Sequence, residues 1–134
     1  MYLLDTNICI ALIDKNTQAL QQFYRKYAQC YVPTIAIAEL YKGAYCSQRL
    51  SENLQDIEDF LSLIPTIVEF DRKAAVEFGQ IQGELKQLGK PTEHLDALIA
   101  AIARSRHDIV VTNNTRHFRE IPNLQLENWL ASEG

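Results

Sequence analysis

Short, continuously apolar runs alternate along this chain with longer segments in which apolar residues recur at helical spacing. Such short runs are typical of buried strands in a parallel sheet, and the helical segments can serve as crossover connections. We predict strands at residues 1–4, 30–32, 66–70, 109–112 and, at an edge of the sheet, 124–126. We predict helices at residues 8–13, 17–27, 35–45 after a cap at Thr34, 54–64, 74–88 and 95–103, with a short turn opened by Phe118. This alternation favours an α/β fold in which helices sandwich a parallel β-sheet.

The chain has the size and composition of one ordinary globular domain, which we expect to span residues 1–134. It is 47% apolar and 22% charged, and its net charge of −4 gives no overall basic field, although a local basic rim or bound cations can still attract a polyanion. Its three cysteines, Cys9, Cys30 and Cys46, lack a C-x-x-C spacing, which suggests reduced core thiols and not a disulfide framework or a zinc site. Without an apolar run long enough for a membrane span or a signal-peptide pattern, we expect a cytoplasmic protein with no membrane contact.

Three carboxylates stand in stretches that otherwise carry almost no charge. Asp5 closes the opening apolar run, Glu39 ends the uncharged stretch that begins at Cys30, and Asp96 is the only charge within residues 95–103. An ionised carboxylate that leaves water without a partner is very costly in free energy. Either each acid has its own cation or hydrogen-bond donor, or the three acids share one doubly charged partner.

The predicted sheet can bring these acids to one edge. Ligands of open parallel sheets bind beyond the carboxyl ends of the strands, where Asp5 follows the first strand and a polar turn, Thr112 to Asn114, follows the fourth. Carboxylates there suit Mg²⁺ or Mn²⁺, which activate water for phosphoryl chemistry. Taken singly, each acid also fits an ordinary role: a helix cap for Asp5, a helix-surface acid for Glu39 and a partner of the helix dipole for Asp96.

Four short motifs carry a family resemblance. They are Leu4-Asp5-Thr6-Asn7, Ala38-Glu39-Leu40, Leu95-Asp96-Ala97-Leu98-Ile99-Ala100 and Val111-Thr112-Asn113-Asn114-Thr115-Arg116-His117-Phe118. In this order and spacing they resemble the PIN-domain ribonucleases, above all the VapC toxins of bacterial type II toxin–antitoxin pairs. The ending, from Ile121 to Trp129, resembles the VapC pattern as well, so the resemblance covers nearly the whole chain.

The resemblance implies a single PIN domain, a Rossmann-like sandwich of the nuclease type, that acts as an endoribonuclease with Mg²⁺ or Mn²⁺. It assigns Asp5, Glu39 and Asp96 to catalysis and to the metal, with Glu39 binding the metal directly or through water. Thr6 and Asn7 match the family's first turn, where they orient Asp5 or contact substrate. The resemblance also implies a homodimer, and a larger assembly with a VapB-type antitoxin that reaches into the active site and so relieves the inhibition of translation.

The segment after the fourth predicted strand departs from the family pattern. Many relatives have a fourth acid there, often just before the Phe, whereas this chain has Asn114 and His117. An uncharged corner should weaken a second metal site, which leaves the number of metals open. His117 is a surface side chain, a phosphate contact or, when protonated, an acid for the leaving group. Thr112 would contribute a hydroxyl at the edge of the site.

The implied substrate is RNA, which positive side chains must hold despite the acidic total. The candidates are Lys42, Arg49, Arg104, Arg106, Arg116 and Arg119. Because Arg116 flanks the predicted site, its removal should weaken RNA binding and reduce the salt dependence of binding. The turn from Thr112 to Thr115 resembles that of VapC toxins that cut the anticodon loop of initiator tRNA, and an exposed loop suits single-strand recognition.

Two other classes of protein compete with a nuclease. A receiver domain or an acid phosphatase also gathers aspartates at strand ends, but Asn7 stands where the phosphatase pattern needs a second Asp. A PIN-like scaffold that binds RNA or protein with little or no catalysis is supported by the missing fourth acid. EDTA should abolish RNA cleavage by an enzyme, and an antitoxin-like reading frame upstream would favour the toxin.

Overall fold

A five-stranded sheet forms the centre of the computed structural model, which describes residues 1–130 and leaves residues 131–134 of the expected domain outside the described part. The strands follow the order β3-β2-β1-β4-β5. They are β1 (Tyr2–Leu4), β2 (Cys30–Pro33), β3 (Ile67–Val68), β4 (Ile109–Val111) and β5 (Gln125–Glu127). Neighbouring strands all pair in parallel, which confirms the predicted sheet and its edge strand β5.

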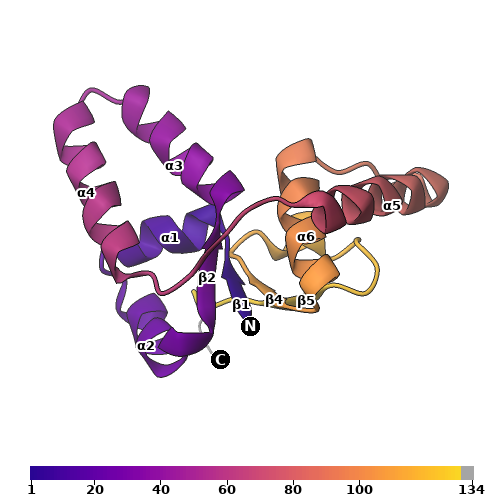
Figure 1. Cartoon of the computed structure of the whole chain (residues 1–134), viewed down its shortest axis with the longest axis horizontal. Coiled ribbons are helices and arrows are strands. Elements are labelled where there is room, and N and C mark those ends of the chain that lie inside the picture. Colours follow the sequence, from indigo (N-terminus) through magenta and orange to yellow (C-terminus); the bar gives the residue numbers. More distant parts are fainter. Residues whose placement is uncertain (131–134) are drawn as a thin grey trace.

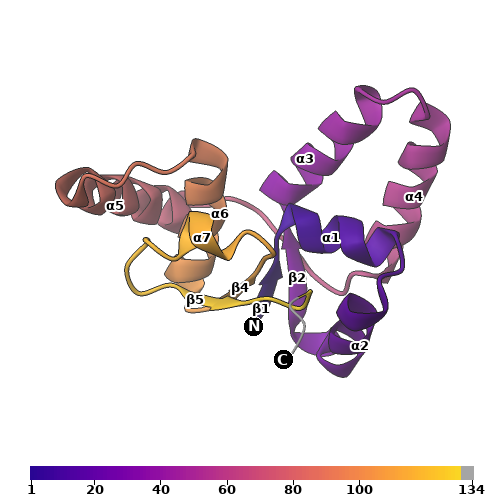
Figure 2. The same ribbon diagram turned by 180° about the vertical axis from the view of Figure 1, so that it is seen from behind.

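Helices cover both faces of this sheet (Figure 1, Figure 2). They are α1 (Thr6–Ile13), α2 (Thr17–Arg25), α3 (Thr34–Tyr45), α4 (Leu50–Leu63), α5 (Arg72–Leu88), α6 (His94–Arg106) and α7 (Thr115–Phe118), with a 3₁₀ turn at Tyr27–Gln29. Helices α1 to α4 pack on one face, and α5 to α7 pack on the other. The predicted sandwich is therefore confirmed. Within residues 1–130, no helix is long and apolar enough to cross a bilayer.

The sheet separates two apolar cores because successive strand residues point to opposite faces. Leu4 and Val32 pack among α1 to α4, whereas their neighbours Leu3 and Tyr31 pack against α5 and α6. All four side chains are completely buried. The three inner strands, β1, β2 and β4, are thus apolar at every position, as the sequence indicated, since both of their faces are covered, whereas the edge strand β5 includes Gln125 and Glu127.

Several local predictions were wrong in their limits, among them the helix predicted at 54–64, which begins four residues earlier at Leu50. Thr34 is the first residue of α3, and Pro33 occupies the cap position, where its extended backbone both ends β2 and leads into the helix. The strand predicted at 66–70 is reduced to β3, an edge strand in which Ile67 is 47% exposed. Phe118 ends α7 and is buried in the second core, so the short helix lies before it in the chain.

Candidate active site

Asp5 lies at the carboxyl end of the central strand and begins α1. Leu4 pairs with Val111, and the Asp5 backbone N–H donates to the Val111 carbonyl at 3.0 Å, which sets Asp5 beside Thr112. One oxygen of the Asp5 carboxylate caps α1 by accepting the Thr6 backbone N–H at 2.8 Å. The other accepts the Thr112 hydroxyl at 2.8 Å. Asp5 is therefore a helix cap, which was its ordinary role considered from the sequence. Capping uses only one of its two carboxylate oxygens.

The Asp5 side chain is buried without a compensating charge. It is 4% exposed, and burial is the main cause that raises its pKa. Hydrogen bonds from Thr112, Thr6 and Asn7 lower the pKa in part, while the charge of Asp96 raises it further. All three donors are neutral, and the ion pairs formed within residues 1–130 leave Asp5 without a cation. Such a carboxylate favours a cation from outside the chain.

Asp96 lies in the first turn of α6, as the sequence predicted. Its pKa is raised by burial first, lowered in part by His117 and raised again by the charges of Glu93 and Glu39. The ring nitrogen Nδ1 of His117 lies 3.3 Å from the Asp96 carboxylate, although the His117 side chain is 45% exposed. His117 is thus a partly exposed side chain whose ring contacts Asp96, and its role stays a prediction.

Glu39 faces the other acids from α3. The Thr6 hydroxyl donates to its carboxylate at 2.8 Å, so the same short turn holds both Asp5 and Glu39. The charge of Glu39 acts on Asp96, and the charge of Asp96 acts on Asp5. The structure thus brings the three predicted acids into one electrostatic neighbourhood.

The donor chemistry of this neighbourhood fits a hydrated divalent cation. No group of three or more His, Cys, Asp or Glu side chains in residues 1–130 is arranged tightly enough to hold a single ion by protein ligands alone. Mg²⁺ does not need such a cage, because it usually keeps several waters and binds through one or two carboxylates. Asp5 and Asp96, whose pKa values are both raised mainly by burial, are the acids that a nearby cation would relieve most.

The polar turn after β4 helps to hold Asp5 in place through hydrogen bonds. Thr112 is completely buried, so its hydroxyl lies beneath the site, whereas the sequence placed it at the site's edge. That hydroxyl accepts the Asn114 backbone N–H at 3.0 Å while it donates to Asp5. Asn7 donates its amide to Asp5 at 3.2 Å and accepts the Asn113 backbone N–H at 2.8 Å. Thr112 and Asn7 therefore orient Asp5, and the Asn114 side chain itself is exposed.

The candidate basic residues do not all lie near the acids. Arg104 is mostly buried in ion pairs with acids of α5, and Arg106 pairs with Asp108 at the amino end of β4. Arg116 is exposed and lines a hollow of about 210 Å³ whose wall also includes Asp96. Arg116 is thus well placed for a substrate contact, whereas Arg104 and Arg106 are not.

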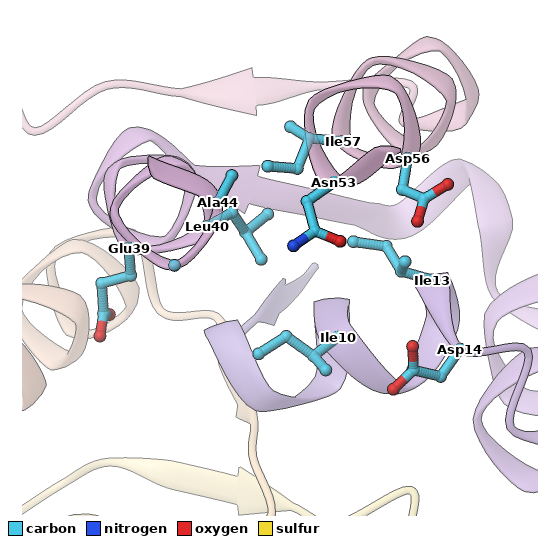
Figure 3. A pocket seen from close by; sticks show the side chains of 10 residues that line it. Ile10, Ile13, Asp14, Glu39, Leu40, Ala44, Asn53, Asp56 and Ile57 are labelled. Atoms are coloured by element: carbon cyan, nitrogen blue, oxygen red, sulfur yellow. The ribbon is translucent and has the colours of Figure 1, made fainter. Parts of the chain in front are cut away.

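A groove that the sequence did not predict opens beside Glu39. It lies between α1, α3 and α4, holds about 220 Å³ and has an apolar wall that includes Ile10 and Ile57 (Figure 3). Glu39 lies toward one end of the groove, and Asp14 and Asp56 lie toward the other (Figure 3). The periodicity of α1 and α4 gave no signal for it, because its lining comes from three helices whose packing is a tertiary property.

Cys9 is a second feature that the sequence missed. It lies one turn after Asp5 in α1, is completely buried, and its thiol donates to the Leu4 carbonyl at 3.7 Å. Burial, and then the charges of Asp5 and Glu39, raise the pKa of this thiol well above its usual value. The Cys9 thiol therefore stays neutral and packs as an apolar side chain next to the acid site. The three cysteines are free, as predicted, but only Cys9 and Cys30 are core thiols; Cys46, at the end of α3, is exposed, so its predicted place in the core was wrong.

The sequence and the structure both resemble known proteins. The PIN domain family model matches residues 2–124. Ribonuclease VapC2 of Haemophilus influenzae is 42% identical over 130 residues, which cover 96% of this chain and 98% of that protein. The tRNA(fMet)-specific endonuclease VapC of Shigella flexneri is 40% identical over 129 residues, which cover 96% and 97%. The DNA-bound VapBC of Salmonella typhimurium superposes with a TM-score of 0.90 at 36% identity, covering 96% of this chain and 97% of that chain.

Proposed function

This chain belongs to the PIN-domain family and to its VapC group, and on that premise we propose that it is a metal-dependent endoribonuclease toxin. One observation carries the proposal: Asp5 is buried with no cation among residues 1–130 beside it, within the electrostatic reach of Asp96 and close to Glu39, at the carboxyl end of parallel strands. Cleavage of RNA by such a protein would inhibit translation until an antitoxin neutralised it.

Asp5 and Asp96 would hold Mg²⁺ or Mn²⁺, and Glu39 would bind it directly or through water. When bound, the metal supplies a more acidic water and neutralises charge on the phosphate oxygens. The donor set supports one such ion. A second ion has less support, because Asn114 and His117 occupy the segment in which many relatives have another acid.

The other residues of the site orient the acids and move protons. Thr112 and Asn7 hold one Asp5 oxygen through hydrogen bonds, which leaves the carboxylate a single orientation. The Thr6 hydroxyl fixes Glu39 in the same way. His117, 3.3 Å from Asp96 and partly exposed, can give a proton to the leaving oxygen when it is protonated. The products would carry 5′-phosphate and 3′-hydroxyl ends.

The substrate would be tRNA, and specifically the anticodon loop of initiator tRNA. The name of the 40% identical Shigella flexneri relative, a tRNA(fMet)-specific endonuclease, supports this choice. An exposed loop offers unstacked bases and an accessible backbone, which suits a shallow site. Arg116 would contact a phosphate next to the cleavage position, since it shares the wall of a hollow with Asp96.

The partner would be a VapB-type antitoxin that occupies the groove of Figure 3. An apolar wall flanked by Glu39 at one end and by Asp14 and Asp56 at the other fits an amphipathic segment with basic side chains at both ends. Similarity to solved VapBC complexes supports this partner. A homodimer, and a larger assembly with the antitoxin, complete the proposal.

Cleavage of purified initiator tRNA tests the proposal. With Mg²⁺ or Mn²⁺ the protein should cut the tRNA at one position, and sequencing of the new ends should place that position in the anticodon loop. EDTA should abolish the cleavage, and readdition of the metal should restore it. A protein that binds the tRNA without cutting it under any of these conditions would instead be the PIN-like scaffold favoured by the uncharged fourth corner.

A further inference from the structure

A second hollow is lined by residues from the end of α5 and from the loop that joins α5 to α6; Figure 1 shows where this loop runs. It holds about 310 Å³. Its lining consists of Gln82, Leu85, Lys86, Gly89, Lys90 and Pro91. Two of these residues carry positive charge and none carries negative charge, in a protein whose net charge is −4. Anions are therefore the ligands that this lining favours.

Gln82 supplies an uncharged hydrogen-bond donor that lacks an acceptor in the described part of the chain. Its amide nitrogen is buried and has no hydrogen-bond partner among residues 1–130. A buried donor without an acceptor costs roughly 1–3 kcal/mol, so a rotation of the Gln82 side chain that turned its amide toward an oxygen-rich ligand in the hollow would be favourable. Lys86, in the last turn of α5, adds a charge beside this donor.

Lys90 connects this hollow to the acid site. Lys90 and Pro91 line both this hollow and the one that contains Asp96 and Arg116, so the two hollows share a wall. The Lys90 amino group pairs with Glu120 at 2.8 Å, but both side chains are about half exposed, at 52% and 44%. An exposed pair of this kind contributes little free energy, so a phosphate can replace Glu120 as the partner of Lys90.

The loop that holds Lys90 begins at a helix end shaped by glycine and is tied to α7. Gly89 ends α5 with a φ of 67°, a left-handed conformation that favours glycine, and Pro91 follows two residues later. The Thr92 hydroxyl donates to the His117 carbonyl at 3.4 Å, which ties the loop to α7. The wall between the two hollows is thus part of the same scaffold as the acid site.

We propose that Gln82, Lys86 and Lys90 form an RNA-backbone subsite that binds a phosphate several nucleotides from the cleavage position. This inference rests on the proposed ribonuclease function and extends it from one bond to a longer stretch of the strand. A polynucleotide that occupies the acid site would pass Arg116 and Lys90 before it reaches Lys86. Long RNA would therefore bind more tightly than a short oligonucleotide that fills the acid site alone.

Three variants test the subsite in cleavage assays with one long and one short RNA. Lys86→Ala and Gln82→Ala should raise KM for the long RNA about three- to tenfold and leave the short RNA unaffected, with the salt slope of binding reduced by about 0.7 in Lys86→Ala. Glu120→Gln should lower KM for the long RNA, because it frees Lys90 and removes a repelling charge. A gain of this kind is not expected from a variant that merely damages the fold.

Lys73→Ala is the matched control, since it removes the same charge from the exposed opposite end of α5. It should leave both KM values unchanged. If the unaltered protein cuts RNA but Lys86→Ala and Lys73→Ala have the same effect, the subsite is wrong and the ribonuclease stands. If the unaltered protein neither binds nor cuts either RNA, the proposed function fails and takes the subsite with it.

Discussion

The two buried carboxylates among residues 1–130 are Asp5, at the carboxyl end of β1, and Asp108, at the amino end of the neighbouring parallel strand β4. Asp108 precedes β4 and accepts hydrogen bonds from the α-amino group of Met1 at 3.0 Å, the Tyr31 hydroxyl at 2.8 Å and the Arg106 guanidinium at 2.8 Å. Burial alone would raise the pKa of Asp108, but these partners together lower it. Asp108 is thus a carboxylate whose charge the chain itself balances.

Asp5 has nearly the same exposure and the opposite electrostatics. It is 4% exposed against 7% for Asp108, but its partners are neutral and its pKa is raised by burial and by Asp96. Burial alone does not distinguish the two acids, but their partners do. We interpret Asp108, which the chain pairs with cations, as a structural residue, and Asp5, whose partners in the described chain are neutral, as a ligand-binding residue. The proposed function depends on this contrast.

The largest effect should come from removing the Asp5 charge. Asp5→Asn should reduce metal-dependent RNA cleavage by more than the roughly 10–100-fold typical of residues that only support a metal ligand. The metal-free protein should remain folded and become no less stable, because the variant removes a buried charge whose pKa is raised by burial. Cleavage rates and urea unfolding of the same preparations measure both quantities. Unchanged cleavage would remove Asp5 from the site.

The matched substitution at Asp108 should instead lower the stability of the fold and leave RNA cleavage nearly unchanged. Asp108→Asn leaves Arg106 with a weaker partner, and the free energy of unfolding should fall by about 2 kcal/mol, below the usual cost for a fully buried pair because Arg106 is 38% exposed. Cleavage at a temperature where the variant is folded should stay within about twofold of the unaltered protein. A variant that is stable but inactive would contradict a purely structural role for Asp108.

The sequence indicated that Asp5 is a candidate site residue but gave no sign that Asp108 is buried, and the reason is physical. Asp5 interrupts an apolar run and ends a strand, so its isolation was visible in the residues around it. Asp108 follows Arg106 and His107 and looks like part of a polar turn. Its burial arises from contacts with Tyr31 and Met1, which lie 77 and 107 residues away in the chain.

In the rest of the molecule, too, features set by local sequence could be predicted, and features set by tertiary packing could not. The strands and most helices follow from local patterns, and the meeting of Asp5 with Asp96 follows from the rule that places ligands at the carboxyl ends of parallel strands. The groove beside Glu39 could not be predicted, since it is formed by side chains from three separate helices. The contact of His117 with Asp96 was hidden for the same reason.

Loss of a neutral donor to Asp5 should have a smaller effect than loss of its charge. Thr112→Val removes the hydroxyl that donates to Asp5 and should weaken metal affinity and cleavage about 10-fold, the lower end for a supporting residue. Thr112→Ser keeps the hydroxyl and is the matched control. Metal titrations of cleavage rate compare the two. Because Val keeps the methyl group and Ser keeps the hydroxyl, equal losses in both variants would contradict a specific role for the hydroxyl that donates to Asp5.

The smallest effects should appear in the pH dependence of metal-free stability. The Asp5 pKa is raised in the folded state, so its ionisation costs stability at neutral pH, and the cost disappears as pH falls through that pKa toward 3.8. The Asp108 pKa is lowered, so its contribution is present above 3.8 and is lost as pH falls further, through the folded-state pKa. Denaturant unfolding at a series of pH values should therefore show Asp5→Asn gaining at neutral pH and Asp108→Asn losing, with both differences shrinking in acid.

Stabilisation by Mg²⁺ or Mn²⁺ tests the contrast between the two acids most directly. The unfolding temperature of the unaltered protein, Asp5→Asn and Asp108→Asn should be measured with and without metal, since a ligand at 100 times its Kd stabilises the folded state by about 2.7 kcal/mol. The unaltered protein and Asp108→Asn should gain the same stabilisation, and Asp5→Asn should gain little or none. An equal gain in Asp5→Asn would show that the metal binds elsewhere and would contradict the assignment of the site.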